Sequence, residues 1–188
     1  GTLLEIGCAN GNYLREAAAL GWTVKGIEFD ANTATRARNT GLDVECTTVE
    51  QFEAPQNSYD LIAGWMVFEH VYQPIETFKR LAQWIKPHGW LVFSVPDASA
   101  LELEVFGARW YALQVPGHLT HFTPRTVAAA LRKGGWQVTR IVWHRNPNNL
   151  FHSLRYWALD KGHPRLANYC ADVIAGKRCV VDIAGRRR

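Results

Sequence analysis

The sequence has no long hydrophobic run and no targeting signal. None of its apolar stretches approaches the about 18 residues that a membrane helix needs, and its first residues do not read as a signal peptide. We therefore expect no membrane span and a cytoplasmic protein. No repeats or low-complexity linkers interrupt the chain, and its 188 residues suit one domain with its own core.

Metal-binding and disulfide patterns are also missing. The four cysteines are far apart and form no C-x-x-C pair, which argues against a zinc cluster and against a disulfide framework. The net charge of +4 owes much to basic residues at the end of the chain, so we expect no nucleic-acid partner. Core packing explains most of the eight tryptophans, and a minority is available to line a pocket for an apolar or aromatic molecule.

What the sequence does contain is a turn of small residues, Gly7 to Gly11, between an apolar opening strand and a helical stretch. Backbone approaches a ligand closely only where side chains are small, and such a turn is typical of a nucleotide-type site. The dinucleotide pattern G-x-G-x-x-G is not met, because its later glycine positions hold Ala9 and Asn12. Glu5, near the strand's end, would repel a pyrophosphate and attract an ammonium or sulfonium group. A tight turn without any ligand is the structural alternative.

A second acidic residue follows at the end of the next expected strand. Glu28 lies about 20 residues past the glycine turn, where a carboxylate can accept both ribose hydroxyls of an adenosine. Taken by itself, Glu28 is better explained as a surface acid at a strand end, but its distance from the Gly7 turn reverses that preference. NAD enzymes share this spacing, so Glu28 supports the binding of an adenosine but does not distinguish one adenosine-containing cofactor from another.

The pattern Glu5-x-Gly7-x-Ala9-x-Gly11 resembles motif I of the class I S-adenosylmethionine (SAM) dependent methyltransferases, with alanine at the middle glycine. Asp60 to Val71 is similar to that family's D-L-I-x-x-x-x-V-L-E-H-V phrase, and Lys86 to Pro96 to its K-P-G-G phrase, with His88 at the first glycine. His118 to Pro124 resembles an H-L-x-H-F-(S/T)-P phrase of small-molecule methyltransferases near the quinone-biosynthesis type.

The resemblance implies an α/β fold: a Rossmann-like, doubly wound sheet of seven strands in the order 3-2-1-4-5-7-6, with the last strand antiparallel. One methyltransferase domain would span residues 1–188, preceded by N-terminal helices that this sequence lacks, and residues 97–123 would be a substrate-covering insertion. After the opening strand, we expect strands over 22–28, 42–47, 59–64, 90–96, 136–143 and 178–184. Helices are expected over 12–20, 31–40, 74–85 and 124–132, and over 148–175 with a break near Gly162.

The cofactor implied by the resemblance is SAM, which leaves as S-adenosylhomocysteine. The residues that the resemblance places beside it come from the ends of the first four strands: Glu5, Gly7, Cys8, Ala9, Gly11, Tyr13, Glu28, Phe29, Val49, Glu50, Trp65, Met66 and Val67. Glu50 matches the position that hydrogen-bonds the adenine amino group. A helix cap or a solvated acid is the alternative for Glu50.

Three histidines are candidates for a general base, since an imidazole titrates near neutral pH. For His70 a structural role at a helix start is favoured over catalysis. His118 and His121 are substrate-facing or brace a loop in the first interpretation, act as a base in the second, and bind a metal in the third. No third ligand pattern supports a metal, so no metal is expected.

The implied reaction moves the SAM methyl group to an oxygen, carbon or nitrogen of a small molecule. Trp110, Tyr111 and Phe122 favour an apolar or aromatic acceptor, although packing explains the same residues. A SAM-binding regulatory module without catalysis stays open. An NAD-dependent oxidoreductase is the remaining alternative.

Overall fold

The computed structural model describes residues 1–144 and 147–175, and their contacts divide the chain into two compact units. The first unit comprises residues 1–96 and 122–139, and the second comprises residues 97–121 together with the described residues from 140 onward. The segment 97–123, expected as an insertion, therefore falls almost wholly in the second unit. That residues 1–188 act as one methyltransferase domain stays a prediction.

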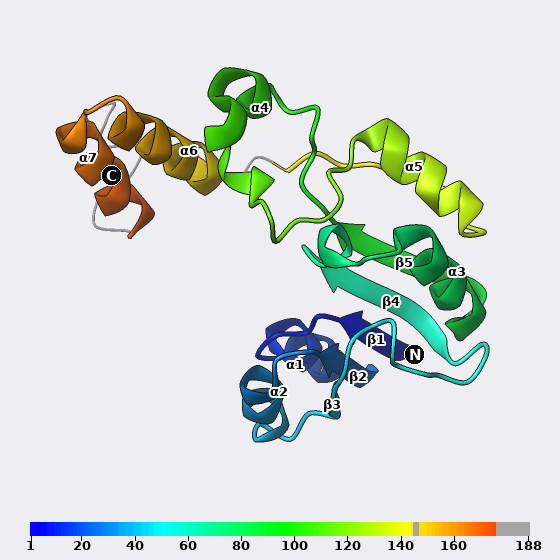
Figure 1. Cartoon of the computed structure of the whole chain (residues 1–188). Coiled ribbons are helices and arrows are strands. Elements are labelled where there is room, and N and C mark those ends of the chain that lie inside the picture. Colours follow the sequence, from blue (N-terminus) through cyan, green and yellow to red (C-terminus); the bar gives the residue numbers. More distant parts are fainter. Residues whose placement is uncertain (145–146, 176–188) are drawn as a thin grey trace. The chain divides into compact units, whose positions relative to one another are not determined.

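The first unit is built on a parallel sheet of five strands in the order β3-β2-β1-β4-β5 (Figure 1). Ile6 of β1 pairs with Ile27 of β2 and with Gly64 of β4, so the carboxyl ends of the central strands lie at one edge. This confirms the first five strands of the expected order. The strands are β1 (Thr2–Ile6), β2 (Thr23–Glu28), β3 (Val44–Cys46), β4 (Tyr59–Trp65) and β5 (Ile85–Ser94).

Helices cover both faces of this sheet. Because successive side chains of a strand point to opposite faces, Leu3 packs in a cluster with Leu14 and Ala34, whereas Leu4 packs in another with Phe78 and Leu131. The first cluster lies under α1 (Asn12–Ala19) and α2 (Ala31–Arg38), the second under α3 (Pro74–Trp84) and α5 (Pro124–Lys133). The sheet is therefore doubly wound.

Side-chain caps fix where two of these helices begin. The Asp30 carboxylate accepts a hydrogen bond from the N–H of Thr33 at 2.8 Å and so caps α2. Thr123 caps α5, and Thr126 returns the contact by accepting from the N–H of Thr123 at 2.8 Å. Such reciprocal caps satisfy main-chain donors that the first turn leaves unpaired.

Two strand boundaries differ from the expectation. β5 begins at Ile85 rather than at residue 90, because Ile85 already pairs with Tyr59. The pairing of β4 with β5 shifts register between Tyr59 and Leu61, and His88 has a φ of 66°. Residues 136–143 form no strand. Their alternation comes from Trp136 and Val138, which pack against the core beside α3 and α5. The strand expected at 178–184 lies outside the described residues.

The second unit is helical. Its helices are α4 (Leu101–Phe106), α6 (Pro147–Asp160) and α7 (Pro164–Ile174), which agrees with the break expected near Gly162. Phe151 of α6 packs against Cys170 and Val173 of α7. In the described part of the chain, no helix combines the length and the apolar character that crossing a membrane requires.

Candidate functional site

The bend between β1 and α1 is held in a conformation that favours small residues. Gly7 and Gly11 have φ values of 66° and 72°, and Ala9 has a φ of 48°. A side chain at Gly11 would place its Cβ 2.2 Å from Leu42 Cδ1, and one at Gly7 would lie 2.9 Å from Val67 Cγ2. Both positions thus need glycine for conformation and for space.

Cys8 anchors the bend to the sheet. Its N–H donates to the carbonyl of Ile27 at 3.0 Å, and its carbonyl accepts from the N–H of Gly11 at 2.8 Å. The side chain is buried against Gly26, and burial raises the pKa of the Cys8 thiol to about 12. Cys8 is therefore a neutral packing residue beneath the bend, and its contact with a cofactor stays a prediction.

Glu28 connects β2 to the same bend. Its Oε2 accepts a hydrogen bond from the N–H of Ala9 at 3.0 Å, and its Oε1 accepts from the N–H of Asp30 at 3.0 Å. The side chain is only 6% exposed. A carboxylate offers about four lone-pair positions, so each oxygen retains capacity for a further donor such as a ribose hydroxyl.

Glu5 is the most unusual group of the site. It is 3% exposed, and its Oε2 has no hydrogen-bond partner among the described residues. Desolvation raises the pKa of Glu5 to about 8, because a buried carboxylate without a compensating charge disfavours ionisation. A cationic ligand group would supply that charge. The Glu5 carboxylate therefore fits the positively charged sulfonium and ammonium groups of SAM.

The segment after β4 packs onto this bend. Val67 lies against Gly7, and the Trp65 ring meets the Tyr13 ring edge-on with centroids 5.3 Å apart. Met66, at a φ of 55°, donates its N–H to the carbonyl of Ser94 at 3.0 Å. Trp65 and Met66 remain 39% and 44% exposed. The structure thus brings together the motif I turn and the post-β4 phrase, as the sequence predicts.

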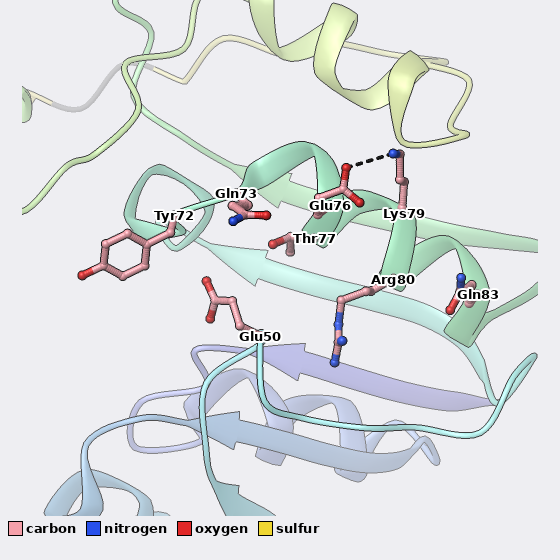
Figure 2. A pocket seen from close by; sticks show the side chains of 8 residues that line it. All are labelled: Glu50, Tyr72, Gln73, Glu76, Thr77, Lys79, Arg80 and Gln83. Atoms are coloured by element: carbon pink, nitrogen blue, oxygen red, sulfur yellow. Dashed lines mark hydrogen bonds and ion pairs between the residues drawn. The ribbon is translucent and has the colours of Figure 1, made fainter.

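The other predicted cofactor residues differ in exposure. Phe29, directly after Glu28, is 75% exposed, whereas Val49 is buried in the core. Glu50 is exposed and lines a hollow of about 480 Å³ beside α3 (Figure 2). No residue of the glycine bend lines this hollow. Lys79 within it is already paired with Glu76 at 2.9 Å, which leaves the hollow without a clear ligand preference.

The three candidate histidines fall in different units. His70 is exposed at the end of the short 3₁₀ helix Phe68–His70 of the first unit. His118 is buried in the second unit and donates from Nδ1 to the carbonyl of Ala112 at 2.8 Å, and His121 donates from Nε2 to the carbonyl of Leu113 at 2.9 Å. Both contacts agree with loop bracing; the catalytic roles stay predictions.

The candidate acceptor residues are mostly packed. Trp110 is buried with Phe106, and Phe122 is buried in the core of the first unit. Tyr111 is half-buried and stacks on His152 with centroids 4.1 Å apart and an interplanar angle of 17°. Desolvation lowers the pKa of His152, so this imidazole favours its neutral form.

The sequence interpretation gives no role to three groups whose surroundings the structure shows. Glu69, just before His70, is buried, and burial raises its pKa. Arg15 and Arg36 both reach Asn10 of the bend. Their long side chains lie on exposed helix surfaces, where no spacing pattern distinguishes them from solvated charges.

Comparisons with known proteins agree with this geometry. A family model described as "Methyltransferase domain" matches residues 1–141. The ubiquinone biosynthesis O-methyltransferase of Burkholderia pseudomallei (strain 1710b) is 27% identical over 152 residues, covering 74% of this chain and 66% of that protein. The protein of that name from Maricaulis maris (strain MCS10) is 30% identical over 156 residues, covering 74% of this chain and 60% of its own length. The chain thus spans somewhat less than two thirds of these relatives.

Solved structures show the same fold. An S-adenosylmethionine dependent methyltransferase from Mesorhizobium loti matches with a TM-score of 0.63 at 19% identity, covering 89% of this chain and 84% of that one. The cyclopropane synthase MmaA2 from Mycobacterium tuberculosis matches with a TM-score of 0.64 at 20% identity, covering 91% of this chain and 72% of that one. With the family match over most of its length, the chain belongs to the methyltransferase domain family of the class I, SAM-dependent type.

Proposed function

We propose that this chain moves a methyl group from SAM to a small aromatic or apolar acceptor. The observation that carries the proposal is the buried Glu5 carboxylate, whose Oε2 has no partner among the described residues and lies at the end of β1 beside the glycine bend. A buried acid of this kind is costly unless a cation compensates it. SAM brings two positive groups, whereas the pyrophosphate of NAD brings negative charge.

The chain's own residues divide the work of holding the donor. The bend offers main-chain groups at Gly7 to the amino-acid part, Glu5 balances positive charge, and Glu28, which also holds the N–H of Ala9, accepts from the ribose. SAM supplies a methyl group on a positively charged sulfur, which a nucleophile takes in line with the departing thioether. Such a transfer depends mainly on alignment and exclusion of water, which contribute about 7 kcal/mol or more.

An oxygen of an aromatic ring is the acceptor that we favour. The relatives are named ubiquinone biosynthesis O-methyltransferases, and the half-buried Tyr111 within the segment 97–123 suits contact with a ring. The acceptor-covering role of that segment belongs to the same proposal. A hydroxyl would lose a proton during transfer, and the exposed His70 is the candidate to accept it.

Ligand-induced stabilisation tests the cofactor. S-adenosylhomocysteine at about 100 times its dissociation constant should stabilise the protein by about 2.7 kcal/mol, which corresponds to a rise in melting temperature of about 5–10 °C at this size. NAD at the same concentration should leave the melting temperature unchanged. Stabilisation by NAD alone would overturn the proposal in favour of an oxidoreductase.

Methyl transfer is tested separately. Purified protein with SAM and a panel of phenols, catechols, carbon acids and amines should form S-adenosylhomocysteine with an oxygen acceptor, detected by mass spectrometry. A chain that binds S-adenosylhomocysteine but methylates nothing in the panel would support the regulatory module instead. Formation of product only with amines would overturn the oxygen-directed part of the proposal.

A further inference from the structure

Two arginines from different helices converge on one residue of the bend. Arg15 of α1 donates from Nη1 to the main-chain carbonyl of Asn10 at 2.9 Å, and Arg36 of α2 donates from Nε to the Asn10 side-chain Oδ1 at 3.2 Å. Each guanidinium is itself oriented by a neighbour, Arg15 by Asn12 and Arg36 by the Thr33 hydroxyl at 2.7 Å. Asn10 thus connects both helices to the bend.

Asn10 sits between two left-handed positions of this bend, of which Ala9 is the strained one. Ala9 before it has a φ of 48° and Gly11 after it a φ of 72°, and the left-handed region costs an alanine about 1 kcal/mol or more. Such conformations persist only where the surroundings over-determine them. Glu28 fixes the N–H of Ala9, and the two arginines fix the carbonyl and the side chain of Asn10.

The consequence concerns ligand affinity more than folding. A bend that already has its bound shape loses little conformational freedom when a ligand arrives, and pre-organisation of this kind strengthens binding. The gain in affinity applies to the part of the ligand that lies over the bend. The adenosine part, which Glu28 and Phe29 would contact at the end of β2, depends less on Asn10.

We propose that Asn10 is a positioning residue, held by Arg15 and Arg36, that sets the affinity for the amino-acid part of SAM. The proposal rests on the proposed binding of SAM and adds three residues that motif I does not specify: Asn10, at one of its variable positions, and Arg15 and Arg36, which lie beyond it. Removing one contact should weaken S-adenosylhomocysteine binding and spare 5′-methylthioadenosine, because the latter has the adenosine but no amino-acid part.

Calorimetry with these two ligands tests the inference. Arg36→Ala should weaken S-adenosylhomocysteine binding about three- to tenfold, as expected for one hydrogen bond of ordinary strength, and should change 5′-methylthioadenosine binding less than about twofold. Arg38→Ala is the matched control, because Arg38 of the same helix bonds to Val44 and Thr35 instead of the bend. Arg38→Ala should leave the affinities of both ligands unchanged.

A double-mutant cycle identifies the contact itself. Asn10→Ala and Arg36→Ala remove the same hydrogen bond, so the double variant should bind S-adenosylhomocysteine no more weakly than the weaker single variant. Arg15→Ala removes a contact to the main-chain carbonyl of residue 10, and Asn10→Ala leaves that contact in place. The losses of affinity in Arg15→Ala and Asn10→Ala should therefore multiply in the double variant. Multiplied effects for the Arg36 pair would overturn the assignment of the contact.

Three further outcomes distinguish a failure of this inference from a failure of the proposed function. Equal losses for both ligands in Arg36→Ala would mean general loosening of the fold and would overturn the inference. A wild-type chain that binds S-adenosylhomocysteine while Arg36→Ala binds it equally well overturns this inference alone. A wild-type chain that does not bind S-adenosylhomocysteine overturns the proposed function, and the inference falls with it.

Discussion

Glu28 accepts a hydrogen bond from the main-chain N–H of Ala9 at 3.0 Å, so the acid at the end of β2 shapes the bend at the end of β1. The two strands are parallel neighbours whose pairing runs up to Ile6 and Ile27, and Glu28 directly follows Ile27, which brings the groups together. The sequence interpretation assigns Glu28 to the ribose only. The structure gives it this additional partner without exhausting its acceptor capacity.

We predict that Glu28→Ala weakens S-adenosylhomocysteine binding by about 100-fold, because hydrogen bonds to a charged group contribute about 1.5–3 kcal/mol each. The melting temperature should also fall, since Ala9 loses its partner. Titration calorimetry and thermal unfolding measure the two effects. Glu45→Ala is the control: Glu45 is an exposed acid of β3 that faces Lys25. A dissociation constant unchanged in Glu28→Ala would remove Glu28 from the site.

The raised pKa of Glu5 predicts that binding releases protons. Between about pH 4.5 and 8 the folded, ligand-free protein keeps Glu5 protonated, and a cation beside it favours the carboxylate. At pH 7, SAM binding should therefore release up to about one proton from this group. Calorimetry in buffers of different ionisation enthalpy measures the release. Glu5→Gln should abolish this contribution; the same release from wild type and Glu5→Gln would rule out Glu5 as its source.

The same group sets a pH dependence of stability. Across about pH 4.5 to 8 the folded state binds a proton that the unfolded chain has lost, so the free energy of unfolding should fall as pH rises. Glu5→Gln lacks this proton, and the variant should gain stability relative to wild type as pH rises through the window. Urea unfolding at pH 5 and pH 8 measures the difference. A difference that stays constant with pH would show that Glu5 is ionised in the folded protein.

Much of the fold follows from local patterns in the sequence. The apolar strands, the glycines after α1 and α2, and the caps at Asp30 and Thr123 act within a few residues, so strand and helix positions can be predicted. Residues 136–143 show the limit of this approach. Their alternation predicts a strand, yet it reflects the packing of Trp136 and Val138 on the core, and only tertiary structure distinguishes the two causes.

The candidate site divides in the same way. Motif spacing places the bend, Glu28 and the segment at Trp65 together because the carboxyl ends of parallel strands meet at one edge of the sheet. Arg15 and Arg36 carry no such signal, since their role depends on the angle between two helices and the bend. The aromatic character of Trp110 and Phe122 suits acceptor contact and core packing alike, and only their burial shows that they pack a core.

The cysteines allow a test of where the cofactor lies. Cys46 is exposed at the end of β3, opposite Glu28 in the register, whereas Cys8 and Cys170 are buried. In a Cys179→Ser background, a maleimide should label Cys46 alone, and S-adenosylhomocysteine should slow that labelling because the adenosine part would lie beside Glu28. Mass spectrometry follows the rate. An unchanged rate at saturating ligand would place the adenosine elsewhere.

Ala9 is the one departure from motif I in the bend, and its φ of 48° makes it a source of strain. Ala9→Gly should stabilise the protein by about 0.5–1 kcal/mol, because relief of the left-handed strain exceeds the added freedom of the unfolded chain. The melting temperature should rise by about 1–4 °C. A fall in melting temperature would mean that the Ala9 methyl group contributes packing that outweighs the strain.

Gly11→Ala should have the opposite effect and a larger one. Its Cβ would lie 2.2 Å from Leu42 Cδ1, so Leu42 must move, in addition to the strain of a φ of 72°. Gly21→Ala separates these causes, since Gly21 has a φ of 85° and no heavy atom within 4 Å of its added Cβ. Gly21→Ala should cost about 1 kcal/mol, and Gly11→Ala should cost more. Equal losses in urea unfolding would show that Leu42 yields freely and that the bend needs glycine only for its conformation.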